Sequence, residues 1–195
     1  FSITEEAMED NLYDSLSARY TKALARSMAY TKQVKAANPL NQGFSGGNFN
    51  SGDGVDLFST AHPLVSGGTN SNTFATQADL NETSLENAVI QIAGWTDERG
   101  LLIAAKPRKL IVPPAGMFTA SRILESDGRP AFLTDTNAFF IMTDVPNGFK
   151  HFARTPLETS MDGDFDTGNV RYKARERYSF GVSDPLGAFG SSGSS

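Results

Sequence analysis

A few serine, histidine and aspartate residues could together do hydrolytic chemistry. Ser59 stands three residues before His62, and Asp135 could act with His151. A serine nucleophile needs a histidine that takes its proton and an acid that orients the histidine. There is no GxSxG turn that would expose a nucleophile. Ser59 and His62 also share an extended segment, on which their side chains need not meet. No pair of carboxylates stands out for glycoside chemistry either, so the pattern indicates no particular reaction.

Metal and cofactor chemistry also has little support. The chain contains no cysteine, which excludes disulfides, cysteine nucleophiles and Cys-ligated zinc or iron–sulfur sites. The two histidines lie far apart and lack the HExxH spacing of a zinc site. The Gly-rich segment 41–54 has no lysine to make it a phosphate-binding loop, and the aspartates of 162–169 are typical of a solvated turn. We expect no cofactor, no metal site and no enzymatic activity.

A row of positive charges stands out instead. Residues 170–182 alternate with the two-residue period of a strand that has one buried face. A nucleic-acid surface would place aromatic residues among the cations, but here they fall on the opposite face, and the chain has a net charge of −5. We therefore expect the cations to contact carboxylates of a neighbouring element or subunit. The candidate contact residues are Arg171, Lys173, Arg175 and Arg177.

A long helix is predicted at the start of the chain, over about residues 3–37. The first 38 residues contain neither glycine nor proline, and Ser2 with Glu5 fits a capping box. Acidic residues load the first turns and basic residues the later ones, which suits the helix dipole. Apolar residues recur at every fourth position and should form the core-facing stripe of this helix. They are Met8, Leu12, Leu16, Tyr20, Leu24 and Met28.

The remaining pattern predicts an α+β protein. Shorter helices are expected over 83–95, capped by Thr83 and Glu86, and over 115–125. Strand 138–143 should form a hairpin with 149–154 around a Pro-Asn-Gly turn, and 170–182 should be a long strand. Strands are also expected at 101–105 and 109–114. No apolar run approaches the ~18 residues of a membrane span.

The order of these motifs resembles the major capsid proteins of tailed bacteriophages, which have the Hong Kong 97-type fold. The matching stretches cover most of the chain. They are FSITEEAMEDNLYDSLSARYTKALARS at 1–27, GDGVDLFSTAHP at 52–63, SLENAVIQIAGWTDERG at 84–100, KLIVPP at 109–114, FFIMTDVPNGFKHFARTPLE at 139–158 and DTGNVRYKARERYSFGVSDPLGAFG at 166–190.

This resemblance implies a division of the chain into lobes. Residues 1–54 would be the spine helix and connecting loop of a peripheral lobe, and 55–148 an axial-like α/β lobe. Residues 149–195 would supply the long antiparallel strands of the peripheral lobe and a C-terminal tail. The cations at 171–177 would then contact carboxylates in the same subunit or in the next one.

The resemblance also implies a structural role. The subunit would self-assemble through hexamers and pentamers into the icosahedral head, which encloses phage DNA without sequence-specific binding. Scaffolding, portal and decoration proteins would be its partners. It would assemble in the bacterial host cytoplasm and reside in the virion. Two alternatives stay open, an encapsulin-like nanocompartment shell and an unrelated α+β hydrolase.

Two places in the sequence depart from the family pattern. The chain starts at the spine helix, without the preceding arm and extended loop, and the step around Pro130–Ala131 is short. We expect the sequence to be part of a longer subunit, with further chain before Phe1 and between Pro130 and Ala131.

Overall fold

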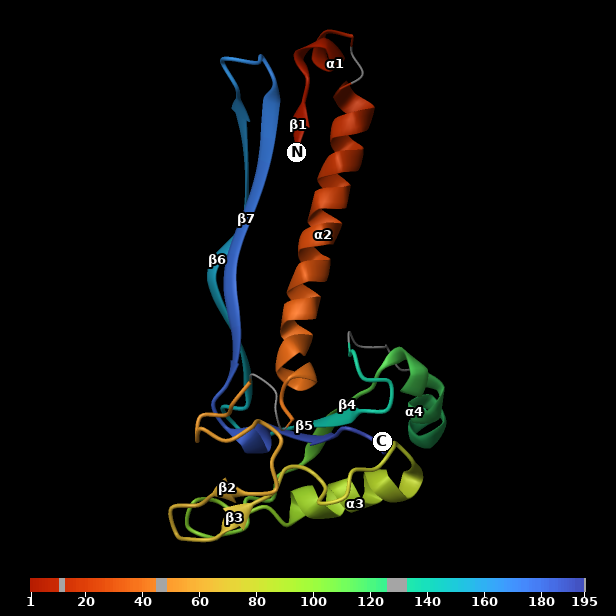
Figure 1. Ribbon diagram of the computed structural model, residues 1–195, viewed down its shortest axis with the longest axis vertical. Coiled ribbons are helices and arrows are strands. Elements are labelled where there is room, and N and C mark those ends of the chain that lie inside the picture. Colours follow the sequence, from red (N-terminus) through yellow and green to blue (C-terminus); the bar gives the residue numbers. More distant parts are fainter. Residues whose placement is uncertain (11–12, 45–48, 126–132, 195) are drawn as a thin grey trace. The chain divides into compact units, whose positions relative to one another are not determined.

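The computed structural model describes residues 1–10, 13–44, 49–125 and 133–194, and it has mixed helix and antiparallel sheet, as predicted (Figure 1). The chain divides into two compact units. Unit 1 comprises Phe1–Val34 and His151–Ser179, and unit 2 comprises Lys35–Lys150 and Phe180–Ser195. Residues 35–54 thus lie with unit 2, and so does the chain from Phe180. The positions at Pro130 and Ala131 lie outside the described residues.

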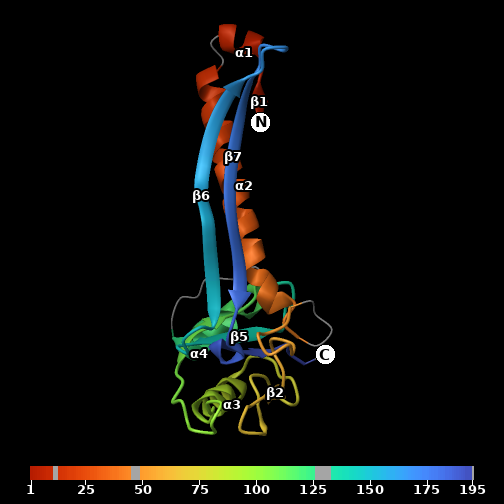
Figure 2. The ribbon, with the colours of Figure 1, turned by 90° about the vertical axis from the view of Figure 1, so that its left-hand side faces the viewer.

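Unit 1 combines the N-terminal helices with a long β-hairpin. Its sheet has the order β1-β7-β6, and β1 runs antiparallel to β7 with Ser2 opposite Arg171. The strands β6 and β7 run side by side along the unit (Figure 2). The elements are β1 (Ser2–Ile3), α1 (Glu5–Glu9), α2 (Tyr13–Asn41), β6 (Phe149–Gly163) and β7 (Val170–Val182), of which α2, β6 and β7 continue into unit 2.

The predicted helix over 3–37 is divided in the structure. Helix α1 ends at Glu9 with Asp10 as its C-cap, and α2 begins at Tyr13. The expected Ser2–Glu5 capping box is wrong, because pairing with β7 holds Ser2 in a strand. Thr4 is the N-cap instead, and its Oγ1 accepts a hydrogen bond from the backbone N–H of Ala7 at 3.4 Å.

Unit 2 is built on a three-stranded antiparallel sheet with β5 in the middle, in the order β4-β5-β8. Phe139 and Ile141 of β5 belong to one apolar cluster, and Phe140 belongs to another. Because alternate residues of a strand face opposite sides, both faces of β5 are covered. This explains the unbroken apolar run in its sequence. The strands are β4 (Pro107–Ile111), β5 (Phe139–Thr143) and β8 (Ala188–Ser191).

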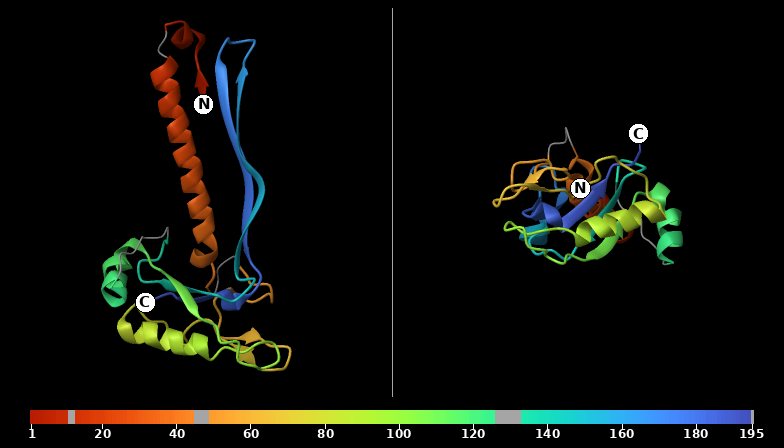
Figure 3. Two further views of the ribbon diagram at one scale, coloured as in Figure 1. Left: turned by 180° about the vertical axis from the view of Figure 1, so that it is seen from behind. Right: turned by 90° about the horizontal axis from the view of Figure 1, so that it is seen from below.

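Helices cover one face of this sheet (Figure 3). Ala88 and Ile92 of α3 (Glu82–Ala93) and Ala120 of α4 (Met117–Leu124) pack in the cluster with Phe139. The helices confirm the expected segments 83–95 and 115–125. The cap of α3 lies before the predicted one, since Asn81 and Ser84 form the capping box and Thr83 and Glu86 do not. The short helix η1 (Pro114–Gly116) precedes α4.

The opposite face of the sheet is covered by the end of α2 and the chain that follows it. Leu40, Leu57, Phe58 and Ala188 pack around Phe140. The short strands β2 (His62–Pro63) and β3 (Thr69–Asn70) pair with each other, and η2 (Pro185–Gly187) leads into β8. No helix among the described residues is long and apolar enough to cross a membrane.

Two predicted strand arrangements are wrong. Strand β5 pairs with β4 and β8, whereas β6 pairs with β7, so 138–154 is not a hairpin. Residues 101–105 form no strand and make only a single bridge, between Leu102 and Thr96. The long strand expected at 170–182 is confirmed, because β7 has these bounds.

Candidate functional site

The four predicted contact cations lie along one face of β7. Exposure alternates along the strand, and Arg171, Lys173, Arg175 and Arg177 are all exposed. Arg171 forms an ion pair with Asp164 in the turn between β6 and β7. Among the described residues, no ion pair is found for the other three cations. Lys173, Arg175 and Arg177 thus form a row of exposed cations on this face of β7.

The opposite face of β7 is the one that packs within unit 1. Glu176 accepts a hydrogen bond from the Nζ of Lys32 at 2.5 Å, and this ammonium also lies 5.2 Å from the ring centre of Tyr178. Near the other end of the strand, Tyr172 stacks on Phe1 with ring centres 4.9 Å apart. These contacts use the side chains that alternate with the cations, so the cationic face is directed away from α2.

The predicted stripe on the N-terminal helix is only partly covered. Leu24 and Met28 of α2 are partly buried, while Tyr20 is 48% exposed and Met8, on α1, is 40% exposed. Leu12 lies outside the described residues, and so does the side chain of Leu16. Tyr20 contacts Phe1, with ring centres 5.5 Å apart. A narrow sheet of three strands can cover only one side of a helix, which leaves the rest of the stripe exposed.

Unit 1 exposes apolar side chains and buries few. Among its described residues, Ile3 is the only apolar side chain in the buried class. On β6 and the turn after it, large apolar side chains are exposed on both sides of the strand. They are Phe152, Leu157, Met161 and Phe165. Exposed apolar groups of this kind are typical of surfaces that meet another protein.

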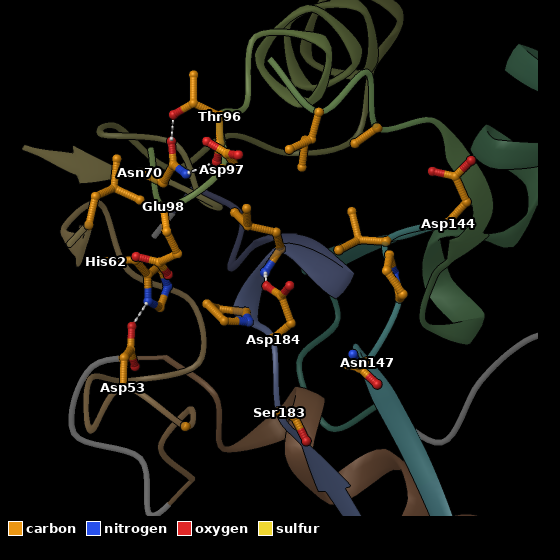
Figure 4. Close-up of a pocket in the computed structure, with 18 of the residues that line it drawn as sticks. Asp53, His62, Asn70, Thr96, Asp97, Glu98, Asp144, Asn147, Ser183 and Asp184 are labelled. Carbon is orange, nitrogen blue, oxygen red and sulfur yellow. Dashed lines mark hydrogen bonds and ion pairs between the residues drawn. The ribbon is translucent and has the colours of Figure 1, made fainter. Parts of the chain in front are cut away.

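Unit 2 contains a pocket of about 870 Å³. Its titratable lining residues come from several separate segments, and Figure 4 shows the histidine and the carboxylates among them around the cavity. Carboxylates outnumber cations on the walls, so the pocket favours positive charge. The charged or titratable lining residues are Asp53, His62, Asp97, Glu98, Asp144, Lys150 and Asp184.

His62 is the best-buried polar group of this wall, with 2% of its surface exposed. Its Nδ1 lies 2.6 Å from Oδ2 of Asp53, and its Nε2 lies 3.1 Å from Oδ1 of Asn72. Burial raises the pKa of Asp53, but hydrogen bonds from His62 and from the N–H of Val55 outweigh it, so the pKa lies below its usual value. Asp53 therefore remains a carboxylate down to acidic pH.

The pKa of Asp184 is shifted in the opposite direction, above its usual value. Burial raises the pKa of its carboxyl group, and the nearby charges of Glu98 and Asp53 add to the rise. The hydrogen bond from the N–H of Leu186 and the proximity of His62 oppose it. A raised pKa is thus the expected result for a carboxyl group that is partly buried near other carboxylates.

The arrangement does not support a serine hydrolase. Both ring nitrogens of His62 are already occupied by Asp53 and Asn72, and Oγ of Ser59 accepts a hydrogen bond from the N–H of Ala61 at 3.2 Å. Of the second candidate pair, Asp135 belongs to unit 2 and His151 to unit 1. Among the described residues, no group of three or more acidic or histidine side chains could hold a metal ion.

Sequence reasoning missed the buried polar groups around His62. Segment 66–73 is rich in Gly, Ser, Asn and Thr, which predicts a surface loop, yet Asn70, Asn72 and Thr73 are buried. Alternation of Asn70 and Asn72 is the one available signal, and by itself it does not distinguish a buried amide from an exposed one.

Comparisons with a family model and with solved structures both find phage or phage-related proteins. A family model described as phage capsid protein matches residues 1–190. A solved structure from Mycobacterium phage Che8 aligns with a TM-score of 0.56 and 13% identity, over 97% of this chain and 67% of that one. A phage-related protein from Bordetella bronchiseptica RB50 aligns with a TM-score of 0.56 and 11% identity, over 97% and 70%. At such identities the likeness shows the fold alone. Among curated proteins, none matches the chain significantly.

Proposed function

Since the chain belongs to the phage capsid protein family, we propose that it is a major capsid subunit of the Hong Kong 97 type, which self-assembles into an icosahedral head around phage DNA. The match to the family over residues 1–190 carries this proposal. The family is a structural one, and the pocket of unit 2 offers no nucleophile and base in contact. We propose no enzymatic activity, and we place the protein in the virion after assembly in the host cytoplasm.

The surface of unit 1 supports self-assembly. Its described residues bury one apolar side chain, while Phe152, Leu157 and Met161 of β6 are exposed. Strand β6 also lies at the edge of its sheet, since the order is β1-β7-β6. An edge strand with exposed apolar residues tends to associate unless it is covered. In a shell, hexamers and pentamers of the same chain would cover it, and symmetry would close the assembly.

The cationic face of β7 gives this proposal a charged contact. Lys173, Arg175 and Arg177 have no ion pair among the described residues, although the chain as a whole is acidic. Carboxylates of a neighbouring subunit are the complementary group in a shell made of one chain. Scaffolding, portal and decoration proteins would be the other partners. In this proposal, the genome is enclosed and not read by sequence.

The first test is assembly of the full-length protein. We expect closed, regular shells in electron micrographs after expression in bacteria. Shells that carry a protein cargo in place of DNA during infection would favour the encapsulin-like alternative. A stable monomer under all solution conditions, with turnover of a small substrate, would overturn the capsid proposal in favour of a hydrolase.

The second test concerns Arg175. Arg175→Glu should leave the subunit folded, since the side chain is exposed and an isolated surface charge changes stability by about 0.5 kcal/mol or less. It should strongly reduce shell yield, because the reversed charge would face carboxylates of the next subunit. Arg175→Lys is the matched control and should assemble normally. Normal assembly of a folded Arg175→Glu variant would remove Arg175 from the subunit contact.

A further inference from the structure

Positive and negative charges are separated within unit 1. Segments 1–10 and 162–169 contain seven carboxylates and no cation, and we call them the acidic tip. Segments 13–34, 151–161 and 170–179 contain nine arginine and lysine residues and three carboxylates, and we call them the basic stem. The unit therefore has one strongly negative surface and one strongly positive surface, although the two charges nearly cancel.

Contacts inside unit 1 bring the two segments of the acidic tip together. Strand β1 pairs with the start of β7, and Ser2 lies opposite Arg171, just after the β6–β7 turn. A Cβ added to Gly168 in this turn would collide with the carboxylate of Glu5 on α1. Figure 2 shows α1 and the turn at the same end of the unit. The carboxylates of the two segments therefore lie at one end of unit 1.

The acidic tip is exposed and little neutralised within its own chain. Asp164 forms an ion pair with Arg171, but no other carboxylate of the tip has an ion pair with a described residue. Phe165 in the same turn is fully exposed. The acidic residues alone are typical of a solvated turn, but an aromatic side chain gains nothing from water and is a common anchor in protein interfaces. The tip thus has both a charge and an apolar group to offer a partner.

The cations of the basic stem form two rows. Arg19, Lys22 and Arg26 of α2 are exposed and spaced by three and four residues, so they share one side of the helix. With Tyr30 they line a hollow of about 570 Å³ on the surface of α2. The second row is the one on β7 described above. None of the cations in the two rows except Arg171 forms an ion pair with a described residue.

The acidic tip is too far along β7 to neutralise the row on its own strand. A strand advances by about 3.3 Å per residue, so Lys173 lies about 13 Å and Arg177 about 26 Å from Asn169, where the turn ends. At physiological ionic strength, exposed charges more than about 8 Å apart are largely screened from each other. These cations are therefore left for carboxylates outside their own chain.

We propose that the acidic tip of one subunit docks on the basic stem of a second copy of this chain. The inference rests on the proposed self-assembly and names the surfaces that make the contact. Every copy has both surfaces, so each can provide a tip and accept one. Two tips repel each other, and so do two stems, so tip to stem is the favoured contact. Phe165 supplies its apolar anchor.

Nucleic acid is the other polyanion that a basic surface could bind. A DNA duplex on the stem would also face the seven carboxylates of the tip on the same unit, and the chain as a whole has a net charge of −5. A second copy avoids this repulsion, because it meets the stem with its tip. The charge distribution therefore favours a second copy as the occupant.

Two charge-reversed variants of the full-length protein test the contact. Each variant keeps one surface intact, and its replaced side chains are exposed, so its urea unfolding should stay close to that of the wild type. Each alone should give at least about tenfold less shell than the wild type. The tip variant carries Glu6→Lys, Asp162→Lys and Asp166→Lys, and the stem variant carries Lys173→Glu, Arg175→Glu and Arg177→Glu.

A mixture of the two variants reads the contact directly. The intact stem of the tip variant can bind the intact tip of the stem variant, so in analytical ultracentrifugation we expect the mixture to associate more strongly than either variant alone. The complex should dissociate between about 0.1 M and about 1 M salt, because the screening length falls from about 10 Å to about 3 Å. Variants that assemble as the wild type does, or a mixture that does not associate, would overturn the proposal.

Matched controls separate charge from shape. Glu6→Asp with Asp162→Glu and Asp166→Glu keeps the charge of the tip and should assemble like the wild type. Phe165→Ser changes no charge and no buried contact, so it should leave the fold unchanged and lower the shell yield. A normal shell yield of this variant would contradict the anchor role of Phe165.

Failure of this contact and failure of the proposed function give different results. A wild-type protein that forms no shell overturns the proposed function, while association in the mixture would still establish the contact between copies. Wild-type shells together with normal shells of the tip variant would keep the proposed function and overturn the contact. If the mixture does not associate, and a labelled DNA duplex binds the wild type but not the stem variant, the stem is a phosphate-binding surface instead.

Discussion

At the scale of single residues, the side chain of Asn72 connects several segments of unit 2. It is fully buried, and its amide contacts Leu57, Pro185, Ser59 and His62. Buried amides are costly unless their hydrogen bonds are made, so such a residue stabilises one arrangement of the segments around it. The composition of 66–73 predicts a loop and says nothing of this burial.

We expect Asn72→Ala to lower the free energy of unfolding by about 2–4 kcal/mol, because it leaves two carbonyl groups, one N–H and His62 without their partner. Urea denaturation at neutral pH measures the loss. Asn87→Ala on the exposed side of α3 is the control and should be neutral or slightly stabilising. A loss below about 0.5 kcal/mol for Asn72→Ala would show that water replaces these hydrogen bonds.

A substitution at Asp184 should have the opposite effect and stabilise the folded protein. Burial and nearby carboxylates raise the pKa of Asp184, so at neutral pH its charge costs the folded state free energy. Asp184→Asn keeps the oxygen that caps Leu186 and should stabilise the protein by up to about 1 kcal/mol, since the site is partly solvated. The gain should vanish below about pH 4, where the carboxyl group of the unfolded chain is protonated. Thermal unfolding at both pH values tests this.

Asp97 provides the control of opposite sign. Hydrogen bonds from the N–H groups of Leu101 and Arg99 lower the pKa of Asp97. Its ionised form is therefore favoured in the folded state, and Asp97→Asn should destabilise the protein at neutral pH. If Asp184→Asn and Asp97→Asn shift the melting temperature in the same direction, the local charges do not determine how these two carboxylates affect stability.

At the scale of elements, the periodicity of the sequence predicted β7 well and the hairpin 138–154 poorly. The alternation of β7 arises from one strand with one packed face, which is a local property. The partner of β5 is not local. Pro146, Asn147 and Gly148 do turn the chain, with Asn147 at a φ of 67°, but they lead into the strand that pairs with β7. The hydrogen-bonding partner β8 lies beyond a long insertion, which no local pattern indicates.

The backbones of Gly148 and Gly187 lie in close contact at the point where the chain leaves this turn. A Cβ added to Gly148 would lie 2.7 Å from the Cα of Gly187, so the two backbones meet where a side chain has no room. We expect Gly148→Ala to destabilise the protein by about 1–3 kcal/mol in urea denaturation. Gly116→Ala is the control, because its Cβ would have ordinary contacts of 3.6 Å or more. Equal stability of the two variants would show that the backbones can separate freely.

At the scale of the whole molecule, the two units differ in how much they bury. Unit 2 has an apolar cluster on each face of β5, and the described part of unit 1 has Ile3 alone in the buried class. The overall class, the long strand and the family resemblance were predictable from residue order. The assignment of 35–54 and of the chain from Phe180 to unit 2 was not, because it depends on long-range contacts such as that of Phe44 with Phe140.

We expect amide hydrogen exchange to follow this difference. In the free subunit, amides of β6 should exchange at least about tenfold faster than those of β5, because few buried contacts protect the long hairpin. On assembly, β6 should become protected while β5 changes little. Mass spectrometry of exchanged peptides measures both states. Exchange in β6 that is as slow as in β5 before assembly would contradict an interface role for this strand.

The order of strands along the chain also has a consequence for synthesis. In unit 2, β5 cannot pair with β8 until the entire β6–β7 hairpin, which lies between them in the sequence, has been translated. In unit 1, β1 cannot form its pairing until β7 has been translated. A nascent chain on the ribosome therefore cannot complete the first unit before Val170 has emerged, or the second before Ala188. No growing chain therefore presents both finished units before Ala188–Ser191 has emerged.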